Sequence, residues 1–208
     1  WGCTFCVASK LYKQRYFFYS AERMFEEIRK LSELFSCHRF VFWDDNLFVV
    51  KERLKRFCEL LIEHKVKIKW SAFCHCDLFL KYEDALVELM KEAGLENISF
   101  GAESGSSKIL DMIKKKITQE QSLATVKKAT VTNLNADFTF MTGFPQETVE
   151  DFKIILQLFR DMLKINPDIS IRLFAFTSYP KIPLLEEEPH LAHFFPKTTE
   201  GWAQLTYQ

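Results

Sequence analysis

The sequence lacks any excess of charge, because its 28 lysine and arginine residues balance 28 aspartate and glutamate residues over 208 positions. Without a net field, nothing indicates binding to nucleic acid or to an anionic membrane. The sequence also lacks an apolar run near the roughly 18 residues of a membrane-spanning helix, and no signal peptide is visible. A hydrophobic content of 48% then predicts a soluble, globular chain, long enough for one sizeable domain.

The cysteines lack the density of a disulfide framework. Six are scattered through the chain, so a reducing cytoplasm is the expected compartment. Cys3 and Cys6 have the C-x-x-C spacing that lets two thiolates bind one metal centre. A zinc site would need two further ligands at similar spacing, and Cys74 and Cys76 lie too close together for a usual zinc knuckle. The remaining option is a cluster held by three cysteines, of which two are present.

The two ends of the sequence differ from its middle. The chain begins at Trp1, without a methionine and in the middle of the cysteine motif, so we expect a fragment whose preceding residues complete that motif. Four of the six prolines lie beyond Ser178, where no strong periodicity remains. We therefore expect residues 1–178 to form the core domain, and residues 179–208 to be a loop that leads into a following region.

Helical and strand patterns alternate between these ends. Apolar residues at helical spacing predict helices at 20–34, 51–64, 82–93, 107–114, 118–130 and 149–164. Short apolar runs predict strands at 39–43, 66–73, 97–102, 136–142 and 169–176, and the first of these reads as a buried strand. Ser20 is a suitable N-cap, Thr118 and Gln121 have the spacing of a capping box, and Gly94 is a typical helix end.

This alternation predicts parallel strands joined by crossover helices. An open doubly wound sheet and a full or partial β/α barrel both fit. Polar clusters follow the strands, as active-site residues do in β/α barrels. They are the cysteine loop, Asp44-Asp45, His75 with Asp77, Glu103-Ser104-Gly105 and Gly143-x-Pro145-x-Glu147. We therefore favour an α/β fold, a partial (β/α)6-type, TIM-like barrel of parallel strands that lacks its first strand.

With these motifs in order, the sequence resembles the radical S-adenosylmethionine (radical SAM) enzymes. Their signature is C-x3-C-x-Φ-C with Φ aromatic, and residues 3–6 match its last four positions, with the first cysteine expected two residues before Trp1. The resemblance is closest to the cobalamin-binding branch. That branch has motifs like those at Asp44–Phe48 (one residue longer here), Gly101–Ser106, Lys115–Thr118 and Gly143–Thr148.

The resemblance implies a 4Fe–4S cluster and S-adenosylmethionine as cofactors, and their chemistry generates a 5′-deoxyadenosyl radical. Three thiolates leave one iron for the amino and carboxylate groups of S-adenosylmethionine. By their places in the motifs, Cys3 and Cys6 would be cluster ligands, and no catalytic residue is assigned. The implied cofactor contacts are Phe5 near the adenine, Asp44 and Asp45 at the methionine amino group, Glu103 at the ribose hydroxyls, Lys115 at the methionine carboxylate, and Gly143 with Pro145 beside the adenine.

Each of these residues also has a structural interpretation. Asp44, Asp45 and Glu103 could serve only as charges near helix N-termini. Lys115 lies in a run of three lysines, which is typical of a solvated face. Gly143 and Pro145 suit a simple turn. His75 is expected to be a satisfied hydrogen-bonding group rather than a catalyst.

The resemblance also bears on partners. The branch usually places a cobalamin-binding domain before the barrel, so cobalamin is a further expected cofactor, held upstream of this chain. Its reactions include methylation of unactivated carbon or phosphorus and ring-forming rearrangements. A small-molecule substrate and an electron donor such as a flavodoxin or ferredoxin are implied.

Two alternatives stay open. One is a methylthiotransferase or a porphyrin-type oxidase of the same superfamily. The other is a degenerate, non-catalytic barrel that acts as a binding domain. The second is compatible with two departures from the related sequences: Lys181-Ile182 stand where a Gly-Thr turn is common, and Tyr19 stands where a basic residue is common.

Overall fold

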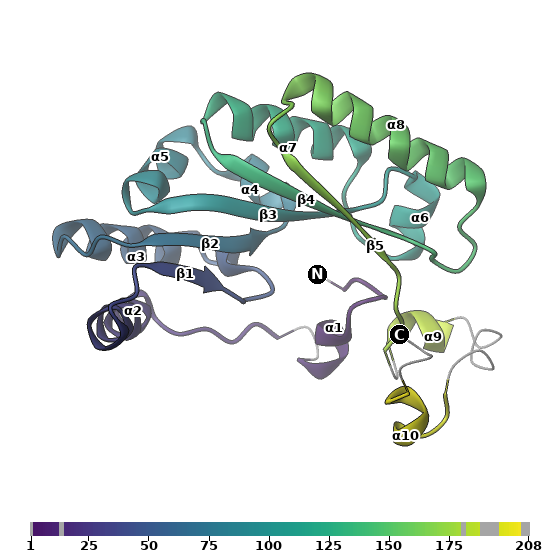
Figure 1. Cartoon of the computed structure of the whole chain (residues 1–208), viewed down its shortest axis with the longest axis horizontal. Helices are drawn as coiled ribbons and strands as arrows, with labels where there is room; N and C mark the ends of the chain where they lie inside the picture. Colours follow the sequence, from purple (N-terminus) through teal and green to yellow (C-terminus); the bar gives the residue numbers. More distant parts are fainter. Residues whose placement is uncertain (1, 13–14, 180–181, 188–195, 205–208) are drawn as a thin grey trace.

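The computed structural model describes residues 2–12, 15–179, 182–187 and 196–204 (Figure 1). Its centre is one parallel sheet in the order β1-β2-β3-β4-β5. The strands are β1 (Arg39–Phe42), β2 (Lys69–Cys74), β3 (Leu95–Glu103), β4 (Asn135–Thr142) and β5 (Ser170–Ala175). A doubly wound sheet reverses its strand order at a switch point, whereas a barrel wall keeps the chain order. The order found here confirms the expected partial barrel.

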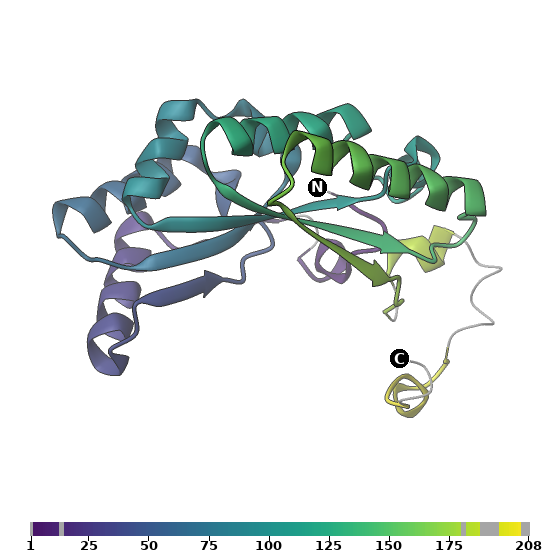
Figure 2. The same cartoon turned by 45° about the horizontal axis from the view of Figure 1, so that its top comes forward.

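The long helices lie along one side of this sheet, and the opposite side is open (Figures 1 and 2). The long helices are α2 (Ala21–Phe35), α3 (Lys51–Glu63), α5 (Asp84–Glu92), α7 (Gln119–Val131) and α8 (Val149–Ile165). Shorter pieces are η1 (Leu47–Val49), α4 (Cys76–Lys81), α6 (Ser107–Met112) and α10 (Thr199–Trp202). Two more, α1 (Val7–Leu11) and α9 (Pro183–Glu187), lie beyond the carboxyl ends of the strands. No helix of the described residues is long and apolar enough to span a bilayer.

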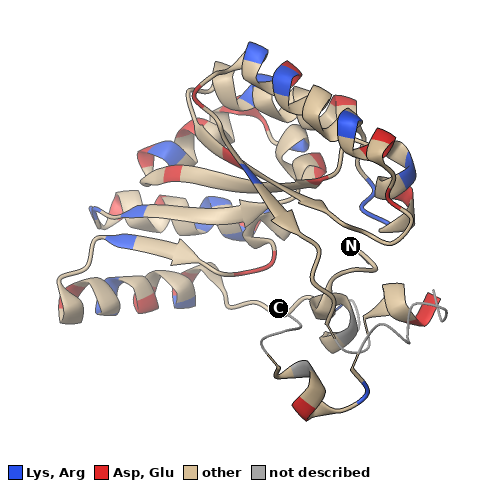
Figure 3. Cartoon of the chain, turned by 45° about the vertical axis from the view of Figure 1, so that its right-hand side comes forward, with Lys and Arg blue, Asp and Glu red and all other residues tan. Residues whose placement is uncertain are grey.

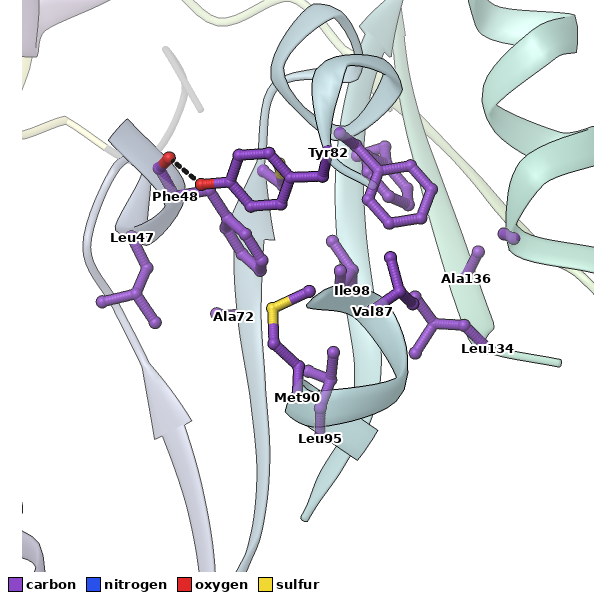
Figure 4. Close-up of a cluster of buried hydrophobic side chains, with 14 of the residues drawn as sticks. Leu47, Phe48, Ala72, Tyr82, Val87, Met90, Leu95, Ile98, Leu134 and Ala136 are labelled. Carbon is purple, nitrogen blue, oxygen red and sulfur yellow. Dashed lines mark hydrogen bonds between the residues drawn. The ribbon is translucent and has the colours of Figure 1, made fainter. Parts of the chain in front are cut away.

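The core lies between the sheet and these helices. Alternate residues of the central strands point toward the helices, and Phe100 of β3 stacks on Phe138 of β4 with ring centroids 5.3 Å apart. Val87 and Met90 of α5 reach the same layer, part of which is shown in Figure 4. Burying one such side chain contributes about 1.5–3 kcal/mol. Because these apolar side chains must face the helices, the residues between them on each strand face the open side of the sheet.

Local signals place the helix starts as predicted. The Ser20 side chain accepts a hydrogen bond from the Arg23 amide at 3.2 Å, so the expected N-cap of α2 is confirmed. Thr118 and Gln121 form the expected capping box of α7. The sequence did not predict α1, α4, α9 or α10, since helices this short show little helical periodicity.

The expected buried strand at residues 39–43 is wrong in one respect. Phe40 and Phe42 pack against the core, but Val41 is 52% exposed and Trp43 is 80% exposed. An apolar run suggests burial on both faces, whereas here only the helix side of β1 is covered. The same holds at the end of α2, where Leu34 is 77% exposed and the buried stripe ends at Ile28.

Two glycines with positive φ give a matched test of close packing. Gly94, which ends α5, has φ +94°, and a Cβ there would overlap the Ile68 carbonyl group. Gly143 has φ +86°, and nothing lies within 4 Å of its Cβ position. We expect Gly143→Ala to lower the free energy of unfolding by only about 1–2 kcal/mol, the cost of a left-handed residue. Gly94→Ala should cost clearly more, because the steric overlap adds to that cost.

Guanidinium chloride unfolding followed by circular dichroism measures both variants. Equal losses for the two alanines would contradict the close approach of Gly94 to Ile68.

Candidate functional site

The loop between Cys3 and Cys6 is fixed at the carboxyl edge of the sheet by Thr4. The Thr4 amide donates to the Ile113 carbonyl at 3.0 Å, and its hydroxyl donates to the Met112 carbonyl at 3.2 Å. From the other side, the Leu184 amide donates to the Thr4 carbonyl at 2.9 Å. Thr4 is only 1% exposed. The loop is therefore held between the end of α6 and the start of α9.

A second apolar cluster packs beneath this loop. The Phe5 ring meets Phe144 edge-on with centroids 5.9 Å apart, and Phe144 packs on Phe176 at 4.8 Å. The buried members of the cluster are Ile109, Ile113, Phe144, Ile182 and Leu184. This packing brings the cysteine loop beside the loop that holds Gly143 and Pro145. The predicted adenine-side residues from two distant motifs are therefore neighbours.

Glu103 and Lys115 form a buried ion pair. The Lys115 Nζ atom lies 2.9 Å from Glu103 Oε1, and the two side chains are 8% and 9% exposed. Glu103 ends β3 in a left-handed conformation, with φ 65°. Its carboxylate lies over Gly101, where a Cβ atom would overlap Glu103 Oε1 and crowd Lys115 Nζ. The glycine in this motif therefore makes room for the pair, and Lys115 does not belong to a solvated face.

The charge of Lys115 acts on the cysteine loop. Burial raises the pKa of the Cys3 thiol above its ordinary value, and the nearby Lys115 ammonium opposes that increase. Burial alone would lower the pKa of Lys115, but Glu103 and Cys3 raise it above its ordinary value. Lys115 is thus a buried cation whose charge acts on the Cys3 thiol. Such a cation favours the thiolate, which is the form that binds metal.

The loop after β4 is organised by Glu147. Its Oε2 atom accepts from the Thr142 hydroxyl at 3.1 Å, from the Phe144 amide at 3.2 Å and from the Gly143 amide. Its other oxygen, Oε1, is buried and has no hydrogen-bond partner among the described residues. The carboxylate thereby sets the backbone of the loop and leaves one acceptor unused.

Asp151 links this loop to the motif after β3. Its carboxylate accepts from the Ser106 hydroxyl at 2.6 Å and from the Thr148 amide at 2.9 Å, and Lys108 lies 3.2 Å away. The hydrogen bond from Ser106 has the largest effect in holding the pKa of Asp151 well below its usual range. The contacts with Thr148 and Lys108 act in the same direction. Sequence reasoning did not single out Asp151. The one available signal was its place three residues after Thr148, the spacing of a capping box.

Asp44 and Asp45 are not drawn into this network. They follow β1, Asp44 half-buried and Asp45 exposed, and neither forms a hydrogen bond or ion pair with the part of the chain that is described. The next residue, Asn46, accepts from the Phe48 amide at 3.2 Å and starts η1. The turn is therefore built by Asn46, and both carboxylates remain available to a ligand.

His75 has a supporting place beside Lys115. One ring nitrogen lies 3.2 Å from the Lys115 carbonyl, and the other contacts the Asp77 carboxylate. Burial, and then the Lys115 charge, lower the pKa of His75 to about 4, although Asp77 acts in the opposite direction. This position agrees with the prediction that His75 is a hydrogen-bonding group.

The donor set fits part of an iron–sulfur site. Among residues 2–12, 15–179, 182–187 and 196–204, no three His, Cys, Asp or Glu side chains gather as a metal site. Cys3 and Cys6 are free thiols on one anchored loop, and a buried cation stands near Cys3. Two soft thiolates beside a fixed positive charge suit two of the three ligands of a cluster.

Comparison with known proteins decides the family. Residues 1–159 match the family model of the Radical SAM superfamily. The chain belongs to the radical SAM superfamily. This confirms the resemblance inferred from the motifs, and membership implies a 4Fe–4S cluster and S-adenosylmethionine as the cofactors.

Two similar proteins are much longer than this chain. The chain is 31% identical over 186 residues to an uncharacterized methyltransferase of Pyrococcus horikoshii, covering 89% of the chain and 39% of that protein. It is 25% identical over 185 residues to the anaerobic magnesium-protoporphyrin IX monomethyl ester cyclase of Rubrivivax gelatinosus, covering 89% of the chain and 32% of the cyclase. The radical SAM chain thus spans less than half of these relatives.

A solved structure shares the fold. The radical SAM methyltransferase TsrM from Kitasatospora setae, with cobalamin and a [4Fe-4S] cluster bound, superposes with a TM-score of 0.77 at 14% identity. The match covers 91% of this chain and 35% of TsrM.

The buried ion pair provides a stability test. Lys115→Met leaves the Glu103 carboxylate buried without its partner, so we expect the free energy of unfolding to fall by about 3–5 kcal/mol. The double variant Glu103→Gln/Lys115→Met removes both charges and should recover part of that loss. Urea unfolding at pH 7 measures all three proteins.

Lys114→Met is the matched control. Lys114 is 50% exposed and pairs with Glu187 at the surface, so its loss should cost about 0–1 kcal/mol. If Lys115→Met were as mild as Lys114→Met, the buried pair would not be a structural constraint.

Proposed function

We propose that this chain is the catalytic core of a radical SAM enzyme that binds a 4Fe–4S cluster through Cys3 and Cys6. The supporting observation is the position of the Glu103–Lys115 pair, which lies over the sheet and within electrostatic range of Cys3. When bound, the cluster and S-adenosylmethionine supply reductive cleavage of the sulfonium and a 5′-deoxyadenosyl radical. In this proposal the third thiolate comes from two residues before Trp1.

The residues of this chain bind and orient S-adenosylmethionine. Lys115 compensates the negative charge of the thiolate at Cys3 and of the methionine carboxylate. Glu103 accepts from the ribose hydroxyls, and Asp44 with Asp45 accepts from the methionine amino group. Two observations support these assignments. Glu103 is a buried acceptor beside the Lys115 cation, and Asp44 and Asp45 are carboxylates after β1 without a partner among the described residues.

The adenine of S-adenosylmethionine would be held by the loop after β4. Phe5, Gly143 and Pro145 would line it, because the Phe5–Phe144 contact brings that loop to the cysteine loop. Gly143 is exposed and has open space around its Cβ position, so a flat ring can approach its backbone. The Glu147 carboxylate accepts from the Gly143 and Phe144 amides and so holds this loop in place.

For the whole protein we propose methyl transfer to a small molecule, with cobalamin bound outside this chain and electrons from a flavodoxin or ferredoxin in the cytoplasm. The name of the Pyrococcus relative supports methyl transfer, and the cobalamin in TsrM supports that cofactor. The cyclase relative supports a second candidate, oxidative ring formation on a small molecule. A cobalamin-binding region upstream of Trp1 is compatible with both.

Cluster reconstitution tests the proposal. A chain extended upstream of Trp1 is reconstituted anaerobically with iron and sulfide, and low-temperature electron paramagnetic resonance is recorded with and without S-adenosylmethionine. We expect a reduced 4Fe–4S signal that shifts when S-adenosylmethionine is added, together with formation of 5′-deoxyadenosine. Cys3→Ala and Cys6→Ala should lose both, because each removes a ligand.

Cys37→Ala is the matched control, since the Cys37 thiol donates a hydrogen bond to the Arg39 carbonyl at the start of β1, far from the cysteine loop. It should bind the cluster as the parent does. Zinc binding, or no cluster in the extended parent protein, would instead support the degenerate barrel that acts as a binding domain.

A further inference from the structure

The open face of the sheet carries a polar cluster that includes none of the side chains assigned to cofactor binding. The strand register aligns Phe73, Ser99 and Asp137 in one row across β2, β3 and β4. In the next row toward the carboxyl edge, Gly101, Thr139 and Arg172 are aligned across β3, β4 and β5. Because alternate residues of a strand share a face, all six lie on the side opposite the buried phenylalanines.

Asp137 is the centre of this cluster. Its Oδ2 atom accepts from the Asn97 amide group at 3.0 Å and from the Ser99 hydroxyl at 3.2 Å, and it pairs with Arg172 Nη2. Three donors converge on one carboxylate oxygen that is anchored to two neighbouring strands. A carboxylate fixed in this way holds the guanidinium of Arg172 in one place over the sheet.

Arg172 is only partly used by this contact. Its side chain is 48% exposed, whereas that of Asp137 is 20% exposed. Within the described parts of the chain, the Nε and Nη1 groups of Arg172 donate no hydrogen bond. A held guanidinium with free N–H groups is the arrangement that proteins use to bind a planar carboxylate.

Apolar side chains border the cluster. Trp43 packs on Phe73 with ring centroids 5.4 Å apart, on the β1 side of the row. Phe174, two residues after Arg172 on β5, is 50% exposed. Charged residues are concentrated on the helices rather than on the strands (Figure 3). The face therefore carries the Arg172 guanidinium held by Asp137, with exposed aromatic side chains after β1 and on β5.

The cluster lies next to the proposed cofactor site. Glu103 and Lys115 occupy the space over Gly101, and the register places Thr139 and Arg172 beside Gly101 in the same row. A substrate that reacts with a radical formed at the carboxyl edge must lie against that edge. The open face in front of Arg172 meets this requirement.

We propose that Arg172, held by Asp137, binds a carboxylate of the substrate, and that Trp43, Phe73 and Phe174 contact its apolar or aromatic part. The substrate is thus an organic acid with a flat apolar body, placed over the sheet beside S-adenosylmethionine. This inference rests on the proposed function, which supplies the adjacent radical. Arg172 and Asp137 are substrate-positioning residues and take no part in cofactor binding.

The test uses a pair of probes that differ only in charge. Binding of 2-naphthylacetate and of 2-naphthylacetamide to the reconstituted, upstream-extended protein is measured by equilibrium dialysis with S-adenosylmethionine present. We expect the acid to bind more tightly than the amide. Arg172→Gln should weaken binding of the acid about tenfold or more, the loss typical of a charge-assisted hydrogen bond, and leave the amide unchanged. Asp137→Asn should weaken the acid less, because the cation remains but is no longer held.

Lys69→Gln is the matched control, since Lys69 is a 59% exposed cation on β2 at the other end of the same face. It should leave acid binding unchanged. Equal binding of acid and amide, or equal loss in Lys69→Gln and Arg172→Gln, would overturn the proposal.

A second readout separates this inference from the proposed function. Formation of 5′-deoxyadenosine without any probe depends on the cluster and should persist in Arg172→Gln. If the parent protein forms none while acid binding still follows Arg172, the proposed function fails and the carboxylate site stands. If 5′-deoxyadenosine forms but Arg172→Gln binds 2-naphthylacetate as tightly as the parent does, only the carboxylate site fails.

Discussion

Parallel pairing of five consecutive strands is the constraint on which the site depends. In a parallel sheet all carboxyl ends lie at one edge, so motifs separated by many residues meet there. Strands in chain order also keep the long helices on one side. The same arrangement therefore produces a buried core on one face, an open face on the other, and a row of functional loops along a single edge. The radical SAM assignment rests on the sequence match over residues 1–159, and the strand order agrees with it.

Within that frame, Glu103 and Lys115 show how a short motif gains chemical meaning. The sequence offered a glutamate at a strand end and a lysine in a basic run. The structure buries both and places Gly101 beneath them, so each residue of the motif has a steric or electrostatic reason. A buried ion pair costs desolvation and is weak evidence for stability alone. Its electrostatic effect on Cys3 explains it better as a fixed charge for ligands.

Much of the fold was predictable, because local signals determine it. Apolar periodicity located all five strands and the long helices, and the caps at Ser20 and Thr118 are contacts between residues close in sequence. What could not be predicted depends on contacts across the chain. Thr4 bonds to residues more than 100 positions away, and Asp151 bonds to Ser106. No periodicity records such bonds. The exposure of Trp43 was missed for a related reason, since an apolar run does not reveal which face of its sheet is covered.

The bonds of Thr4 join the N-terminal cysteine loop to two distant segments, at residues 112–113 and at Leu184. The cysteine loop is clamped by the end of α6 on one side and by residues 182–184 on the other. The position of the cysteine loop is therefore coupled to a segment in which this chain departs from the related sequences, at Ile182. Substitutions at Ile182 or Leu184 would change how tightly the loop is held without touching a ligand. The rigidity of the cysteine loop is therefore set partly by residues outside its own motif.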